Sequence, residues 1–323
     1  MTRAGVFARK ELRDLGRHRI VWILGATLAL AVVIAVVVAS LAFRAQMADY
    51  QAYVADLASS GSAVTAAAPQ LFPLQLLRGG LEYVEIIGAL FAIVVGYGTI
   101  AREAARGTLP LIYTRSHGPR ALVIGKLLGI AAFWAALVTV LVLVAGVTVA
   151  LVGGSGLTVA DAFRLAIAAA AAWVYLMFWS AVAVGLTATM RRPGTALILA
   201  LGLWLAIVLI VPQIGDTMDP DNQVPGGLFK ALAIAKPDEL AVLAHFSHYE
   251  VTRNGLEVTS ISKLFERISF GFLGIKDKYN QQSLGFVWAD MYRYTWAMLA
   301  LLTAGLGFAV SVTTRTRLLR KTA

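Results

Sequence analysis

Residues 20–43 read IVWILGATLALAVVIAVVVASLAF and contain no charged side chain. About 20 apolar residues at a helical rise of about 1.5 Å cross the hydrocarbon core of a bilayer. The run is too long for the core of a signal peptide, and no small-residue cleavage site follows it. It therefore predicts a helix that stays in the membrane.

Further apolar runs repeat this pattern along the chain. They are residues 81–100, 121–151, 162–190, 195–211 and 295–314. Glu82 and Glu85 fall in the first turn of the second run, and no ionisable residue falls in the middle of any run. We predict an all-α polytopic membrane protein, with residues 1–323 forming a single transmembrane domain of six helices.

The composition excludes several classes of protein. Of the 323 residues, 59% are hydrophobic and 14% are charged, whereas about a quarter of a soluble domain is charged. This excludes an ordinary soluble enzyme and a disordered chain. The absence of cysteine excludes disulfides, thiolate-bound metals and thiol nucleophiles.

The basic residues are placed unevenly, although the formal net charge is only +10. With a cytoplasmic N-terminus, the inner segments hold 17 of the 28 Lys and Arg residues and 3 of the 18 acidic residues. These segments are residues 1–19, 101–126, 190–194 and 315–323. The positive-inside rule then predicts a multi-pass protein of the plasma membrane with both termini in the cytoplasm. Membrane lipids, not nucleic acid, account for the basic excess.

Residues 1–19 combine apolar and basic residues near helical spacing. We predict an interfacial helix, whose apolar side enters the acyl boundary and whose bases meet headgroups. Its members include Phe7, Arg9, Lys10, Arg13 and Arg17. The alternative is a basic tail that only sets the topology.

Residues 101–120 form the most informative loop. It contains a charged helix end, a Gly-Thr break, the apolar segment 109–113 and a Gly-Pro turn before the next helix restarts. This order predicts a short helix on the cytoplasmic surface, tied at both ends and suited to docking a soluble partner. The alternative is a topogenic loop whose arginines only obey the positive-inside rule.

This loop resembles the second intracellular loop of ABC-2-type transporter permeases. The matching residues are Arg102-Glu103, Gly107-Thr108-Leu109, Arg120 and Gly125-Lys126-Leu127, whereas Pro110 departs from the pattern. The resemblance implies a coupling helix seated on a separate ATPase. Its coupling residues would be Arg102, Glu103, Arg106, Gly107, Thr108, Leu109, Arg120 and Lys126.

The resemblance also implies partners and cofactors. Two ABC ATPase subunits would carry ATP and Mg, with no cofactor on this chain, and the permease would pair with a second copy or a related permease. The long insertion between the last two spans is similar to that of permeases linked to multicopper-enzyme or nitrous-oxide-reductase maturation.

The sequence contains no phosphate-binding loop of the Gly-x4-Gly-Lys-[Ser/Thr] type, so we expect a non-catalytic subunit driven by another chain. We expect an exporter of an amphiphilic or weakly charged substrate. A scaffold whose segment 212–294 binds a client protein is the alternative. An ion-coupled carrier is disfavoured, because such carriers place ionisable groups in the middle of the membrane.

Two smaller features complete the sequence hypotheses. Segment 212–294 is predicted to be helical and extracytoplasmic, and to pack either on the spans or on its copy in a dimer. Within it, His245 and His248 share a helical face, but without a third ligand a metal site is less favoured than surface histidines. Gly125-x-x-x-Gly129 predicts a close contact between helices.

Overall fold

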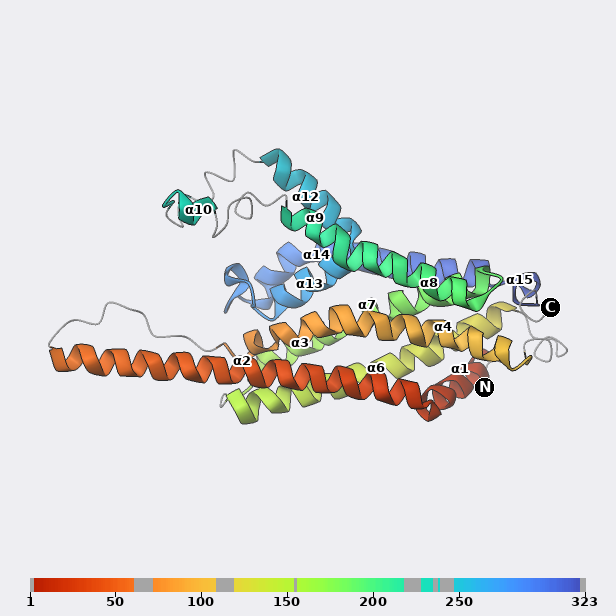
Figure 1. Ribbon diagram of the computed structural model, residues 1–323, viewed down its shortest axis with the longest axis horizontal. Helices are drawn as coiled ribbons and strands as arrows, with labels where there is room; N and C mark the ends of the chain where they lie inside the picture. The colour runs from red at the N-terminus through yellow and green to blue at the C-terminus, as the bar shows by residue number, and fades with distance from the viewer. Residues whose placement is uncertain are drawn as a thin grey trace.

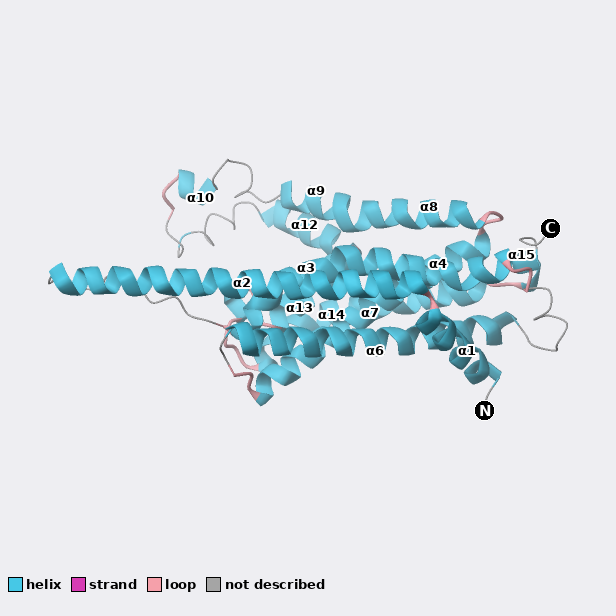
Figure 2. Cartoon of the chain, turned by 60° about the horizontal axis from the view of Figure 1, so that its bottom comes forward, coloured by secondary structure: helices cyan, strands magenta, loops and turns pink. Residues whose placement is uncertain are grey.

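The computed structural model of the protein describes residues 3–60, 72–108, 119–153, 156–217, 228–234, 238 and 247–319. Within these ranges every regular element is a helix (Figures 1 and 2). Six helices are long and apolar enough to cross a membrane. This confirms the predicted all-α polytopic fold with six spanning helices.

The elements follow one another in a simple up-and-down order. In chain order they are α1 (Arg3–Arg17), α2 (Arg19–Ser60), η1 (Pro73–Leu77), α3 (Arg78–Tyr83), η2 (Val84–Gly88), α4 (Ala89–Ala105), α6 (Pro119–Gly153), α7 (Val159–Thr189), α8 (Pro193–Trp204), η3 (Leu205–Ile210), α9 (Val211–Thr217), α10 (Leu228–Ala231), α12 (Ser247–Thr259), α13 (Ile261–Phe272), η5 (Asp277–Tyr279), α14 (Leu284–Val312) and α15 (Arg315–Leu319). Both α1 and α15 lie at one end of the bundle, which we call the terminal end (Figure 1). An even number of spans requires this arrangement.

Helix α7 is the centre of the bundle. In its most apolar stretch 78% of residues are buried, against 22% in α2, the α8–α9 span and α14. The Trp134 indole donates a hydrogen bond to the Ser180 hydroxyl (2.9 Å), which donates to the carbonyl of Ala92 (3.1 Å). These two bonds join α6, α7 and α4. A Cβ on Gly96 would lie 2.3 Å from the Ser180 carbonyl, so α4 and α7 are in backbone contact there.

The second span begins earlier than the sequence predicted. Its helical run starts at Pro73, which places Glu85 about 18 Å along the helix instead of in its first turn. Glu85 belongs to the π-helix η2, and its carbonyl accepts a hydrogen bond from the Tyr175 hydroxyl (2.7 Å). Glu85 is therefore further from the start of its helix than the sequence predicted. The run appeared shorter because its outer turns are less apolar than its inner ones.

Helix α13 explains how Glu85 is accommodated. The Glu85 carboxyl lies against Ser262, Lys263 and Glu266 of this helix. The Phe265 ring of α13 stacks on the Tyr175 ring of α7, with centroids 4.9 Å apart. Helix α13, which follows the fifth span, thus packs on the spanning helices, which is one of the two arrangements predicted for this segment.

Candidate functional site

At the terminal end, helix α1 packs against the start of α6 (Figure 2). Two glycines make the contact possible. A Cβ on Gly125 would lie 2.5 Å from the Phe7 Cβ, and a Cβ on Gly129 would lie 2.8 Å from the Ala8 carbonyl. No side chain fits between the two helices at either position. The predicted glycine pair therefore mediates a close helix contact, and its partner is the N-terminal helix.

An ion-pair network joins α1 to α4 and α6 at this contact. The Lys126 ammonium lies 2.8 Å from a Glu11 carboxylate oxygen and 3.0 Å from Glu103 Oε1. Arg102 contacts the other oxygen of Glu11 at 3.1 Å, and Lys10 contacts Glu103 Oε1 at 2.9 Å. We call these five residues the terminal network. It joins three helices that are far apart in the sequence.

The centre of the terminal network is removed from water. The side chains of Lys126 and Glu11 are each 3% exposed and that of Glu103 is 9% exposed, whereas Lys10 at the rim is 48% exposed. The Lys126 ammonium also donates to the carbonyl of Thr99 (2.9 Å). A buried ammonium carries a large desolvation cost unless carboxylates surround it. The network supplies two.

The pKa of Lys10 reflects this arrangement. Burial lowers it, but the hydrogen bond and negative charge of Glu103, helped by Asp14 and Glu11, more than offset this, so the pKa of Lys10 is raised. The ammonium therefore stays charged at neutral pH. The terminal network thus contains three cations and two carboxylates, and loss of either carboxylate leaves the cations in large excess.

The predicted coupling residues fall into two groups. Arg102, Glu103 and Lys126 belong to the terminal network, so their side chains point into the protein. Arg106 and Gly107, which cap the end of α4, are exposed. On α4, the exposed Arg106 lies one helical turn after Arg102, whereas Lys126 reaches this end of α4 from α6.

The cap itself has a defined geometry. Gly107 has a φ of +64°, a left-handed conformation that favours glycine. The backbone N–H and the hydroxyl of Thr108 both donate to the carbonyl of Glu103, at 3.1 Å and 3.2 Å. Leu109 lies outside the described residues, and Arg120 is exposed in the first turn of α6. The loop therefore leaves α4 directly beside the terminal network.

The residues of the predicted interfacial helix lie on two sides of α1. Phe7 packs against the core, whereas Arg9, Arg13 and Arg17 are exposed at intervals of four residues. Val6 and Leu12, the apolar side chains that α1 leaves exposed, are 56% and 39% exposed. The contact of this helix with lipid stays a prediction.

Sequence reasoning missed Glu11. It stands among five bases that headgroups seemed to explain, so its carboxylate received no role. The signal that could have pointed to Glu11 was Lys126, a single cation inside an apolar helix and between the two glycines. Such a residue requires an acidic partner from elsewhere in the chain.

His18 in the turn between α1 and α2 provides a pH test of this end. Burial, followed by the nearby charges of Arg102 and Arg106, lowers the pKa of His18 below 6.5. The unfolded chain therefore binds more protons than the folded one as the pH falls through 6.5, so stability falls. We expect the melting temperature to drop between pH 7.5 and 5.5, and less so in His18→Gln. An equal drop in both proteins would contradict the assignment.

No metal centre is present among the described residues, which contain no group of three or more His, Asp or Glu side chains that could hold an ion. His245 lies outside the described residues, and the side chain of His248 is not described. The histidine pair therefore stays a prediction.

The six spanning helices define a polytopic membrane protein. At its terminal end, the terminal network holds the N-terminal helix against the spans. Comparison with known families gives the class: residues 6–313 match the ABC-2 family transporter protein family. The chain therefore belongs to the ABC-2 family and is a transporter permease. No curated protein sequence matches the chain.

Proposed function

We propose that this permease exports an amphiphilic or weakly charged substrate, driven by two separate ABC ATPase subunits that dock on residues 101–120. The permease itself binds no ATP, and it works as a homodimer or paired with a related permease. The ATPases lie on the cytoplasmic side of the plasma membrane, together with both termini. The terminal network is the observation that carries the proposal.

The network makes the ends of three helices move together. Glu103 lies one turn before the loop, Lys126 lies less than two turns into the next helix, and both contact α1. A force on the loop is therefore shared by α4, α6 and α1. Because only His18 separates α1 from α2, the force also reaches the first span. Packed helices of this kind move as rigid bodies.

Reconstitution with a P-loop ABC ATPase that co-purifies with this chain from its native host tests the proposal. The permease should bind that ATPase and stimulate its ATP turnover in liposomes. Arg106→Glu should return turnover to the basal rate, because it reverses an exposed charge where the loop leaves α4 and changes no residue of the terminal network. Arg44→Glu, an exposed arginine at the other end of the bundle, is the matched control.

Two results would contradict the proposal. One is stimulated turnover that survives Arg106→Glu unchanged. The other is a chain that binds no ATPase but retains a client protein through residues 212–294, which would support the scaffold alternative.

A further inference from the structure

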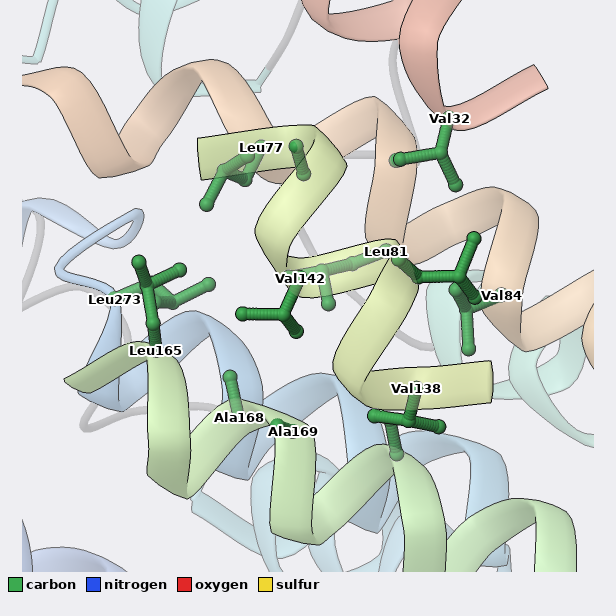
Figure 3. Close-up of a pocket in the computed structure, with 14 residues that line it drawn as sticks. Val32, Leu77, Leu81, Val84, Val138, Val142, Leu165, Ala168, Ala169 and Leu273 are labelled. Atoms are coloured by element: carbon green, nitrogen blue, oxygen red, sulfur yellow. The ribbon is translucent and has the colours of Figure 1, made fainter. Parts of the chain in front are cut away.

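An apolar cavity of about 60 Å³ lies between four spanning helices (Figure 3). Its walls come from α2, the η1–α3–η2 stretch, α6 and α7, with Leu273 from the chain after α13. Small residues of α7, among them Ala168 and Ala169, share the lining with larger side chains such as Val138 and Val142. All 14 residues that line the cavity are apolar.

The lining decides which kind of molecule can enter. A buried water needs about two to four polar partners, and this cavity offers it none from side chains. Apolar cavities stay dry and bind apolar guests. Inside a bundle that spans a membrane, the surrounding apolar molecules are lipid acyl chains. The cavity is therefore suited to a few methylene groups of one chain.

A cation lies beside this cavity without lining it. Arg164 immediately precedes Leu165, which lines the cavity, and it lies one turn before Ala168. Its guanidinium donates to the carbonyl of Phe272 at 3.1 Å and to that of Gln282. Within the described part of the chain no carboxylate pairs with it. Two acceptors use two of its five N–H groups, so both charge and donors remain for a phosphate.

We propose that the cavity and Arg164 together bind one membrane phospholipid. A short stretch of an acyl chain near its glycerol end lies between α2, α6 and α7, and the phosphate contacts the Arg164 guanidinium. The lipid fills space that the alanines of α7 leave open and links this helix to the chain after α13. The inference does not depend on ATP-driven transport.

Native mass spectrometry of the chain purified in mild detergent tests the site. About one phospholipid should remain bound per wild-type chain. Ala168→Phe should reduce lipid retention about tenfold, because its ring displaces two or three methylene groups of the guest. Ala170→Phe is the matched control, since Ala170 is exposed on the opposite side of the same helix. Equal lipid retention in the two variants would overturn the proposal.

The headgroup contact needs its own variants. Arg164→Gln should reduce retention of phospholipid, whereas Arg164→Lys, which keeps the positive charge, should preserve most of it. A loss of the same size in both variants would overturn the role of the charge.

A cross-linking experiment on the wild-type chain avoids the risk that a variant fails to fold. In vesicles containing a phospholipid with a photoreactive group on the first carbons of its acyl chain, cross-links should concentrate in residues 165–172. Residues 196–203 of α8, which include the lipid-exposed Ile198 and Leu199, give the background. A yield in residues 165–172 no greater than this background would show that the cavity binds no chain.

Discussion

Glu11→Gln is expected to release α1 from α4 and α6 and to lower the free energy of unfolding by about 3–5 kcal/mol. The change keeps the shape of the side chain but removes the carboxylate that lies 2.8 Å from Lys126 and 3.1 Å from Arg102. Those two cations would then share Glu103 with Lys10. A buried ammonium without sufficient countercharge costs more than the original pair contributed.

The expected loss can be measured in two ways. Thermal unfolding in detergent gives the stability, and the rate of trypsin cleavage at Arg9 and Arg13 reports release of α1. Asp14→Asn is the matched control, because it removes the same charge from the same helix at a residue that forms no ion pair within the terminal network and acts on Lys10 only through its charge. Equal effects of the two changes would show that Glu11 has no special role.

A double mutant separates the network from simple loss of charge. Lys126→Met alone leaves Glu11 paired with Arg102, and Glu103 paired with Lys10. The pair Glu11→Gln with Lys126→Met should therefore cost less than the sum of the two single changes. Additive costs would mean that the two residues do not interact.

The spans could be predicted from the sequence because a bilayer imposes a minimum apolar length on each helix. The start of the second span could not be predicted in this way. Glu82 and Glu85 ended the apolar run in the sequence, whereas in the structure Glu82 pairs with Arg78 at 3.0 Å and Glu85 lies against α13. The contact with α13 joins residues nearly 180 positions apart, and no local sequence pattern predicts it.

The candidate site shows the same limit. Gly125, Gly129 and Lys126 were visible in the sequence as a close-contact motif with one buried cation. Their partner lies more than 110 residues earlier, on a helix whose bases already had an explanation in headgroup binding. Charge at a membrane surface is satisfied by lipid or by protein, and composition does not distinguish the two. Only the packing of α1 on α6 assigns Glu11 to the protein.

The packing of α1 on α6 can be tested by the same Gly→Ala substitution at two positions of α6, for which we expect opposite effects on stability. Gly129→Ala should destabilise the protein by about 1–3 kcal/mol, because its Cβ would lie 2.8 Å from both the Ala8 carbonyl and the Glu11 Cβ. The backbone of α1 must then retreat, which pulls Glu11 away from Lys126. Trypsin sensitivity of α1 should rise in the same variant.

Gly146→Ala is the matched control on the same helix. Its Cβ would meet only the Leu157 side chain, at an ordinary contact distance of 3.6 Å. Alanine is the better helix former by up to about 1 kcal/mol, so this change should leave stability equal or higher. The difference in sign between the two variants, measured by thermal unfolding, isolates the contact with α1. If Gly129→Ala also stabilises the protein, α1 does not pack against α6, and a force on the loop has no direct route to the first span.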